Sequence, residues 1–468
     1  MYFRFTFYSI NNIINLGDRM FDKKKILILG MARSGVAAAK TLVNLHCKVV
    51  INDINEKQDK KTINELNKLG VKVVLGSHPE NLLDKTFHYL VKNPGIRDDH
   101  PYVVKAKKLK IPVINEVELA YQLLPNDVTL ICITGTNGKT TTTTITYQIM
   151  HEAFGDRVHL AGNIGYPLCG ILDSLKKDDI IVMEVSVQQS VNIHNFHPHV
   201  GLLTNLSPAH IDFLGSYDKY KKTKAKMFYN QTKKDVAIIN LGNHDSLHEL
   251  IDIKSSKKYF SSKRKTDCYL EDDAIYYNGE KVIDTKIVKI PGIHNLENIM
   301  GAISIAKEFD VKNDVIKKVV SNFYGVPHRL EFVGEIDRVR FYNDTEATNI
   351  KCTQIALSSF TKPTIIILGG LERGQNFDDL AEYIGNVKAI IGIGECRERV
   401  REFGEKNNIS TYIYEHLKDG FHKIMYIMKR GDIVLLSPAS ASWDQYKECE
   451  VRGDEFRNLV KELKDEAL

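Results

Sequence analysis

The sequence predicts an α/β fold of three domains with mostly parallel sheets. Short apolar segments typical of strands alternate with helix-forming segments along most of the chain, which is the pattern of parallel sheets flanked by helices. The chain has 468 residues, more than one hydrophobic core usually organises, so several domains are expected. Apolar residues make up 43% and charged residues 26%, which is the composition of a globular protein.

The first predicted domain, residues 20–122, resembles a nucleotide-binding unit. KILILG (25–30) predicts a strand, the alanine-rich segment after it a helix, and KVVIND (48–53) a strand that ends at an acid. The same alternation continues through residues 71–76, 88–96 and 111–119. The turn G-M-A-R-S-G has glycines only at 30 and 35, so it is a weak match to the dinucleotide-binding pattern G-x-G-x-x-G.

The second predicted domain, residues 123–325, begins with the strand VTLICIT (128–134). Its other apolar strands are expected at 178–186, 199–206 and 235–241. A hairpin is predicted around Asn278-Gly279, a strong turn signal, and helical patterning resumes near residue 294. The third domain, residues 326–468, repeats the α/β pattern with strands at 364–370, 387–394 and 432–438.

ITGTNGKTT (133–141) is typical of a phosphate-binding loop between a strand and a helix. Backbone N–H groups of the loop can hold phosphate oxygens, Lys139 can reach the terminal phosphates, and a threonine hydroxyl can reach Mg²⁺. The strict pattern requires Gly where Ile133 stands, so the loop is a shortened version. A glycine turn with an exposed lysine is the alternative. The candidate nucleotide-binding residues here are Gly135, Thr136, Asn137, Gly138, Lys139, Thr140 and Thr141.

Glu184 and His210 each follow an apolar strand of the second domain. Ligands of open α/β sheets bind at the carboxyl ends of the strands, so we expect these two side chains to converge with Lys139. Taken singly, an acid or a histidine in a loop is more often structural or merely exposed. The shared position at strand ends favours a site.

Composition excludes several classes of protein. The net charge of +5 comes without a long basic block, which gives no indication of nucleic-acid binding. Seven scattered cysteines without zinc-like spacing are interpreted as reduced thiols of a cytoplasmic protein. No apolar run approaches the ~18 residues of a membrane span. Residues 1–19 lack the features of a secretion signal and are interpreted as a loose extension, so Met20 is an alternative start. A monomer is favoured.

Eight motifs occur in the order seen in the Mur ligases, and the chain from about Lys24 resembles that family. They are GTNGKTT (135–141), AGNIGYP (161–167), HID with YKKTKAKMF (210–228), GIHNLEN (292–298), GVPHRLE (325–331), NDTEATN (343–349), LGGLERGQNFDDL (368–380) and SPASASWDQYKECEVRGDEF (437–456). The last three are similar to those of the member that adds D-glutamate to UDP-N-acetylmuramoyl-L-alanine.

The resemblance implies an ATP-dependent amide ligase of cytoplasmic peptidoglycan precursor synthesis. In this family the carboxylate of the UDP substrate takes the γ-phosphate of ATP, giving an acyl phosphate and ADP, and the amine of the incoming amino acid then displaces phosphate. Two anions must approach each other, so Lys139 and two Mg²⁺ ions are expected to neutralise the developing charge. The implied partners are UDP-N-acetylmuramoyl-L-alanine, D-glutamate and ATP.

The resemblance also implies roles for individual residues. The catalytic and metal-binding set would be Lys139, Thr140, Glu184, His210 and Lys224, the last as a carbamate. An ordinary surface lysine is the alternative for Lys224, because four other lysines lie close to it in the sequence. The remaining nucleotide contacts would be Asn295, Asn298, Arg329 and Asp344. The UDP substrate would contact Ser34, Asp53, Asn93, Gly95 and Asn163, which makes the Gly30 turn a uridine site and not a NAD site. The carboxylates of D-glutamate would contact Thr348, Arg373 and Ser442.

The sequence departs from the family pattern in three places. The segment EVSVQQ has Val187 and Gln188 where the family has Ser and Phe, Glu346 replaces a lysine, and Cys449 replaces a phenylalanine. Glu346 reverses a charge near an acidic amino acid. We expect it to point to solvent or to pair with Arg373, leaving D-glutamate as the substrate. A changed amino acid, such as L-glutamate or a less acidic one, is the alternative. The exchange at Cys449 is tolerable if the contact there is made by backbone.

Two other functions remain open from the sequence. The first is a non-catalytic paralogue that holds a UDP-muramoyl peptide or ATP, which the retention of Lys139, Glu184, His210 and Lys224 disfavours. The second is a ligase like folylpolyglutamate synthase. Such a ligase shares the phosphate loop but would not be expected to carry the SPASASWDQY and LGGLERG motifs or the N-terminal UDP domain.

Overall fold

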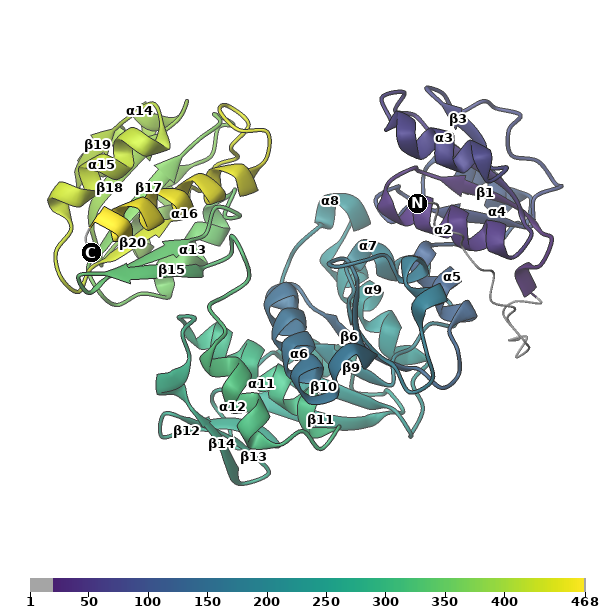
Figure 1. Ribbon diagram of the computed structural model, residues 1–468, viewed down its shortest axis with the longest axis horizontal. Coiled ribbons are helices and arrows are strands. Elements are labelled where there is room, and N and C mark those ends of the chain that lie inside the picture. The colour runs from purple at the N-terminus through teal and green to yellow at the C-terminus, as the bar shows by residue number, and fades with distance from the viewer. Residues whose placement is uncertain (1–19, 467–468) are drawn as a thin grey trace, which may run out of the picture. The chain divides into compact units, whose positions relative to one another are not determined.

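The computed structural model describes residues 20–466 (Figure 1). These residues divide into two compact units. The first unit contains the described residues up to Asp267 together with Gly301–Val311, and the second contains Cys268–Met300 and the residues from Lys312 onward. The extension expected over residues 1–19 lies outside the described residues. The domain boundaries expected after residues 122 and 325 remain predictions. Within residues 20–466, each helix is too short or too polar to span a bilayer.

The first unit begins with a parallel five-stranded sheet of order β3-β2-β1-β4-β5. Its strands are β1 (Lys25–Leu29), β2 (Lys48–Asp53), β3 (Lys72–Leu75), β4 (Tyr89–Lys92) and β5 (Val113–Ile114). Its helices are α2 (Arg33–Asn44), α3 (Lys60–Lys68), α4 (Pro101–Lys108) and α5 (Glu116–Leu123). Alternate residues of β1 enter two cores: Ile26 and Ile28 pack in the cluster that includes α2, and Leu27 and Leu29 in the cluster that includes α4. Burial on both faces explains why these strands are apolar throughout.

The end of this sheet differs from the sequence expectation. Of the segment 111–119, only two residues form a strand, because Asn115 caps α5 by accepting a hydrogen bond from the Glu118 N–H. An Asn at the N-cap position starts a helix by satisfying one of its free N–H groups.

The same unit contains six further strands, all in parallel pairs, in the order β11-β10-β9-β6-β8-β7. They are β6 (Thr129–Thr134), β7 (Val158–Gly162), β8 (Ile180–Glu184), β9 (Val200–Leu203), β10 (Val236–Asn240) and β11 (Ser256–Ser261), of which β7 and β11 were not predicted. The helices are α6 (Lys139–Phe154), α7 (Val187–Ser190), α8 (Ile211–Leu214), α9 (Tyr217–Tyr229) and α10 (His244–Glu249), with short 3₁₀ turns η1 (Gly155–Arg157), η2 (Leu168–Gly170) and η3 (Leu172–Ser174).

The second unit opens with an antiparallel ribbon of β12 (Cys268–Glu271), β13 (Ala274–Tyr277) and β14 (Glu280–Asp284), followed by the 3₁₀ turn η4 (Thr285–Ile287). Asn278 and Gly279 join the last two strands with φ of 49° and 83°, which confirms the predicted hairpin. Two helices follow along the chain, α11 (Ile293–Lys307) and α12 (Asn313–Ser321).

A six-stranded sheet of order β15-β16-β20-β17-β18-β19 forms the rest of this unit, antiparallel only between β15 and β16. The strands are β15 (Glu331–Ile336), β16 (Val339–Asn343), β17 (Thr364–Gly369), β18 (Val387–Ile393), β19 (Ser410–Ile413) and β20 (Ile433–Leu436). The helices are α13 (Ile350–Ser358), α14 (Arg397–Lys406), α15 (Leu417–Ile427) and α16 (Cys449–Glu466), with the 3₁₀ helix η5 (Phe377–Tyr383).

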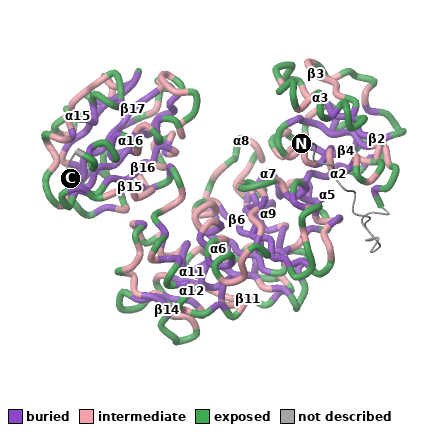
Figure 2. Tube along the Cα trace, in the orientation of Figure 1, coloured by how far each residue is buried: buried purple, intermediate pink, exposed green. Residues whose placement is uncertain are grey.

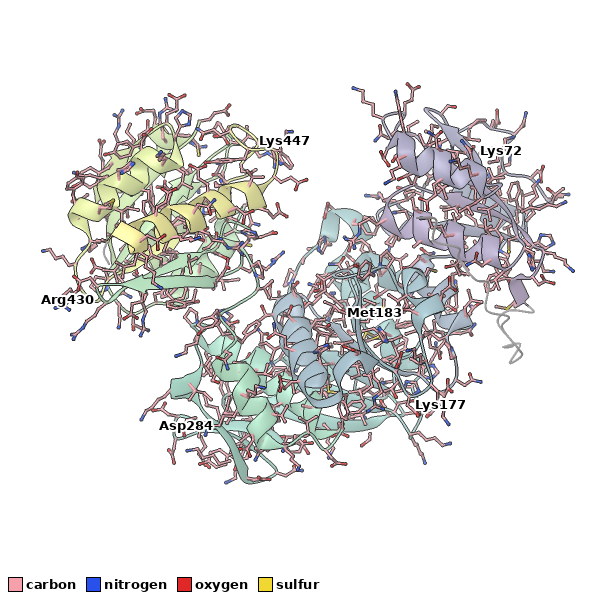
Figure 3. All side chains as sticks on the ribbon, in the orientation of Figure 1. Lys72, Lys177, Met183, Asp284, Arg430 and Lys447 are labelled. Carbon is pink, nitrogen blue, oxygen red and sulfur yellow. The ribbon has the colours of Figure 1, made fainter. Side chains whose placement is uncertain are left out.

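Central strands of both units are buried, as the purple trace of β6 and β17 shows (Figure 2). Charged side chains such as those of Lys72 and Arg430 point away from the fold, whereas Met183, the residue before Glu184, lies inside it (Figure 3). The loops that carry the candidate site residues therefore begin at the ends of buried strands, which hold them in place.

Candidate functional site

The candidate phosphate loop has the predicted order of strand, glycine turn and helix. Gly138 is left-handed, with φ 79°, and directly precedes Lys139, the first residue of α6. Gly135 has φ 148°, and a Cβ atom at this position would lie 1.9 Å from Thr204 Oγ1. Only glycine fits there without movement of the neighbouring loop. The N-terminus of this 16-residue helix supplies the N–H groups and the partial positive charge that phosphate oxygens require.

A second loop, which follows β9, fixes the phosphate loop. The N–H of Thr136 donates to Asn205 O at 2.8 Å, and the N–H of Asn137 donates to Asn205 Oδ1 at 3.1 Å. Thr204 Oγ1 donates to Asn137 O at 2.6 Å. The predicted contacts of Thr136 and Asn137 with ATP would therefore compete with existing bonds, whereas the helix N-terminus is positioned for the anion. Lys139 Nζ donates to Thr136 O at 2.9 Å.

Glu184 ends β8 and is 1% exposed. Its Oε1 accepts a hydrogen bond from Asn163 Nδ2 at 2.8 Å, whereas its Oε2 is buried with no hydrogen-bond partner among residues 20–466. An unpaired buried carboxylate oxygen is costly unless a cation satisfies it. Glu184 therefore fits the role of a metal ligand.

Lys224 lies on the inner face of α9 and is 1% exposed, so the surface-lysine alternative is excluded. Tyr220 and Phe228, four residues before and after it, are buried on the same face. Its Nζ donates to Thr134 Oγ1 at 3.3 Å. Burial lowers the pKa of Lys224 well below its ordinary value, the positive charge of Lys139 lowers it further, and the charge of Glu184 opposes both. These surroundings favour the neutral amine, which is the nucleophilic form.

His210 directly precedes α8 in a left-handed conformation, with φ 50°. Its ring lies 6.3 Å from the ring of Tyr220 and nearly parallel to it. Burial lowers the pKa of His210, and the charges of Lys224 and Lys139 lower it further. A neutral imidazole can act as a metal ligand or a hydrogen-bond acceptor. The structure thus brings His210, Lys139 and Lys224 within electrostatic reach of one another, and Lys224 within reach of Glu184.

A pocket of about 410 Å³ lies beside this cluster in the same unit. It is lined by four of the five predicted substrate residues, Ser34, Asn93, Gly95 and Asn163. Asn93 organises this wall by donating to Ser34 Oγ at 3.2 Å and accepting from the Gly95 N–H at 3.0 Å.

Asp53 is not among the residues that line this pocket. Its Oδ2 instead accepts a hydrogen bond from the Met31 N–H at 2.7 Å, which holds the turn after β1. A Cβ atom at Gly35 would lie 2.0 Å from Gly30 O, so α2 packs closely on that turn. The two glycines of the weak sequence match therefore serve a tight turn and close helix packing.

Sequence reasoning missed several residues of the pocket wall. They are Arg33, Glu116, Ser186, Gln188 and Gln189. Gln188 is one of the departures from the family pattern, and the neighbouring departure, Val187, is a buried core residue. Glu116 is 2% exposed, and its Oε1 accepts a hydrogen bond from the Cys169 N–H at 2.5 Å. Burial raises the pKa of Glu116 to about 7.

The second unit holds the predicted ribose and adenine residues. Asp344 accepts hydrogen bonds from the Leu330 N–H at 3.0 Å and from Ser437 Oγ at 2.8 Å. Burial raises the pKa of Asp344 to about 7. Asn298 Nδ2 donates to Asn295 Oδ1 at 3.1 Å, so these two predicted residues contact each other in the first turns of α11.

The expectation that Glu346 points to solvent or pairs with Arg373 is wrong. Glu346 is half-buried and forms an ion pair with Arg329, with Oε2 3.3 Å from Nη2. The N–H of Glu346 donates to His328 O at 3.1 Å, which brings its side chain next to Arg329. Arg373 instead lies over the ring of Trp443, 4.7 Å from its centroid.

The remaining departure, Cys449, forms a hydrogen bond through its backbone. Its carbonyl oxygen accepts a hydrogen bond from Thr345 Oγ1 at 2.9 Å. The structure also brings Cys449 together with Glu346 and Glu450, whose ligand atoms all lie within 4.8 Å of one another. Two departures that are far apart in the sequence are therefore neighbours in the fold.

The residues predicted to bind the amino-acid substrate come after three strands of the sheet in the second unit. Ser442 is 1% exposed, and its hydroxyl has no hydrogen-bond partner within the described part of the chain. Arg373 is exposed and Thr348 half-buried. An unpartnered buried hydroxyl beside a chain segment that carries an exposed cation is a suitable receptor for a carboxylate.

Comparisons with known proteins match all three parts of the chain. Residues 24–115 match the Mur ligase MurD-like N-terminal domain, residues 133–306 the Mur ligase middle domain, and residues 328–440 the Mur ligase glutamate ligase domain. The chain is 41% identical over 450 residues to UDP-N-acetylmuramoylalanine--D-glutamate ligase of Geobacillus kaustophilus, covering 95% of this chain and 99% of that one. It is 44% identical over 449 residues to the ligase of the same name from Enterococcus hirae, covering 94% and 96%.

Solved structures show the same fold at low sequence identity. UDP-N-acetylmuramate-alanine ligase MurC from Thermotoga maritima matches with a TM-score of 0.57 at 19% identity, covering 95% of this chain and 100% of that one. MurF ligase from Thermotoga maritima in complex with ADP matches with a TM-score of 0.56 at 16% identity, covering 89% and 95%. These likenesses establish the fold alone. Because the identity above 40% extends over almost the whole length of the relatives, the chain belongs to the Mur ligase family.

Proposed function

We propose that the protein adds D-glutamate to UDP-N-acetylmuramoyl-L-alanine with consumption of ATP, as a step of peptidoglycan precursor synthesis. The observation that carries this proposal is the cluster around Glu184. A buried carboxylate oxygen without a partner and a buried lysine lie together beside the helix that opens with Lys139. The names and near-complete coverage of the relatives support the choice of substrates.

The first chemical step joins two anions, so it depends on charge. The carboxylate of the alanyl group attacks the γ-phosphorus of ATP, a carbon-bound oxygen forms the new P–O bond, and ADP leaves. In this proposal Lys139 and the N-terminus of α6 hold the phosphates. Thr140, Glu184 and His210 would hold Mg²⁺, which supplies further positive charge when bound. The unpartnered Oε2 of Glu184 and the lowered pKa of His210 fit that role.

Lys224 fits a carbamate. A neutral amine is required for attack on carbon dioxide, and burial beside Lys139 favours that form. Starting from the neutral amine, the new N–C bond forms with loss of one proton, so the side chain becomes an anion. The anion would satisfy the positive charge of Lys139 and would provide oxygen ligands for a second Mg²⁺. Thr134 Oγ1, 3.3 Å from Nζ, would lie beside the carbamate nitrogen.

The second chemical step forms the amide. The neutral amine of D-glutamate attacks the acyl carbon, the C–O bond to phosphate breaks, and the amine loses a proton. Thr348, Arg373 and Ser442 would hold the glutamate carboxylates, and the unpartnered hydroxyl of Ser442 supports this placement. Holding the amine in line with the acyl carbon accounts for much of the catalysis expected from this unit.

The test is phosphate release from ATP in the presence of UDP-N-acetylmuramoyl-L-alanine and a panel of amino acids that includes D-glutamate, L-glutamate and D-glutamine. We expect turnover with D-glutamate and little with the others. Absence of turnover with every amino acid would refute the proposed reaction. A preference for L-glutamate or a less acidic amino acid would instead implicate the exchange at Glu346.

A further inference from the structure

Arg452 is a buried cation whose hydrogen-bond partners among the described residues are all uncharged. It lies in α16, is 1% exposed, and is among the largest fully buried side chains. Nε donates to Thr345 Oγ1 at 3.0 Å, Nη1 to Gly369 O at 3.3 Å, and Nη2 to Thr345 O and Ser440 O at 3.1 Å each. Among the described residues, no carboxylate forms an ion pair with this guanidinium.

This arrangement is energetically unusual. A buried charge without a counter-ion costs several kcal/mol, and buried arginines are normally paired with carboxylates. Burial lowers the pKa of Arg452 to about 10, in line with that cost, and the charge of Asp444, which forms no ion pair with Arg452, opposes this shift only in part. Arg457 on the same helix shows the common solution, because its Nη2 lies 2.8 Å from a carboxylate oxygen of Glu331. Helix α16 therefore carries one neutralised and one unneutralised arginine.

The acceptors of Arg452 belong to three separate segments, at the ends of three strands. Thr345, Gly369 and Ser440 lie in the segments NDTEATN, LGGLERG and SPASASW, at the carboxyl ends of β16, β17 and β20. The same three segments carry the residues proposed to hold the amino acid, which follow Thr345, Gly369 and Ser440 by two to four positions along the chain.

The guanidinium lies directly beneath one of these loops. A Cβ atom at Gly370 would lie 3.0 Å from Arg452 Nη1 and 2.2 Å from Ala441 O. Ala441 directly precedes Ser442, whose buried hydroxyl has no partner among residues 20–466. The charge of Arg452 and the unpartnered hydroxyl of Ser442 are therefore both close to the segment around Ala441.

We propose that Arg452 is a positioning residue for the anionic amino-acid substrate. It ties the three loops into one receptor, and it keeps an unneutralised positive charge beneath them that stabilises the carboxylates of the bound amino acid. Arg452 acts through the loops and through its electric field, and does not touch the substrate. This inference rests on the proposed function, because it takes the dicarboxylate as the missing counter-charge.

The experiment compares the full-length protein with Arg452→Lys, Arg452→Gln and Arg457→Gln. Steady-state phosphate release gives kcat and a separate KM for D-glutamate, ATP and UDP-N-acetylmuramoyl-L-alanine, and circular dichroism with thermal melting reports folding. We expect Arg452→Gln to raise the KM for D-glutamate at least ~10-fold, which corresponds to about 1.4 kcal/mol, while the other two KM values change less than ~3-fold. Arg452→Lys, which keeps the charge, should restore part of the loss. Arg457→Gln should leave the KM for D-glutamate unchanged.

Several outcomes would overturn the inference. These are an unchanged KM for D-glutamate in a folded Arg452→Gln protein, an equal rise in all three KM values, and an Arg452→Lys protein no better than Arg452→Gln. If Arg452→Gln does not fold, Arg452→Lys alone must show a selective rise of the KM for D-glutamate, and a uniform rise overturns the inference. Wild-type turnover is measured before any variant is compared. Absence of turnover with every amino acid would refute the proposed function itself.

Discussion

Glu116→Gln is expected to stabilise the protein at alkaline pH and to leave it almost unchanged in acid. Glu116 is 2% exposed in the wall of the 410 Å³ pocket, and burial raises its pKa from 4.5 to about 7. At about 1.4 kcal/mol for each pKa unit, this rise corresponds to about 3 kcal/mol of free energy. Glutamine is close to isosteric with glutamate and can still accept the hydrogen bond from the Cys169 N–H.

The sign follows from proton binding. Between pH 4.5 and about 7 the folded protein holds the Glu116 proton more tightly than the unfolded chain does, so stability decreases as the pH rises through that window. The variant lacks this dependence. The free energies of unfolding of wild type and Glu116→Gln are measured by urea denaturation at pH 5 and pH 8. Far-UV circular dichroism monitors the unfolding. Between these two pH values, the free energy of unfolding of the variant should gain about 2 to 3 kcal/mol over that of the wild type.

A second glutamate on the same helix provides the control. Glu118 is fully buried, and its carboxylate accepts hydrogen bonds from the backbone N–H groups of His194, Asn195 and Phe196. Glu118→Gln should destabilise the protein by about 1.5 to 3 kcal/mol at pH 8, because it weakens bonds to a charged group. If Glu116→Gln differs from wild type by the same amount at pH 5 and pH 8, the reasoning about its burial is wrong.

Three further outcomes are expected. Lys139→Ala should lower kcat at least ~100-fold in the phosphate-release assay, because it removes charge stabilisation at the phosphates, and activity near that of wild type would contradict its role. Lys224→Ala should be inactive and partly restored by added short carboxylic acids, which can replace the carbamate oxygens; no restoration at any concentration would count against the carbamate. Gly135→Ala should lower the free energy of unfolding by about 1 to 3 kcal/mol and raise the KM for ATP, because φ is 148° and the new Cβ would lie 1.9 Å from Thr204 Oγ1. A variant as stable as wild type in thermal melting would show that the loop can relax around the methyl group.

The parts of the site that local sequence patterns predict are those at the ends of strands. Glu184 ends one apolar strand of a parallel sheet and His210 follows another, so their positions at the carboxyl ends of strands predict that they lie on the side of the sheet where the phosphate loop begins. Lys224 could not be separated from its neighbours by composition, because the segment around it is rich in lysine. Its burial follows from the spacing of Tyr220, Lys224 and Phe228, which places one aromatic residue a helical turn away on each side.

Contacts between residues that are far apart in the chain could not be predicted from the sequence. Glu346 lies next to its partner Arg329 because the Glu346 N–H donates a hydrogen bond to His328 O. No local sequence pattern predicts this hydrogen bond. The role of Arg452 depends on three loops that meet only in the folded sheet. The edge strand β7 was missed because its five residues, VHLAG, are only partly buried and form a weak apolar run.

The hydrogen bond between Asn163 and Glu184 has a consequence for the affinities of the two sites that it joins. Asn163 lines the pocket proposed to bind the UDP substrate, and its amide donates at 2.8 Å to the carboxylate proposed to bind the metal. Any ligand that reorients this amide changes the affinity of the carboxylate for a cation, and thermodynamic linkage requires the cation to change the affinity of the pocket by the same factor. Occupancy of the two sites is therefore expected to share a coupling free energy, carried by a single amide group.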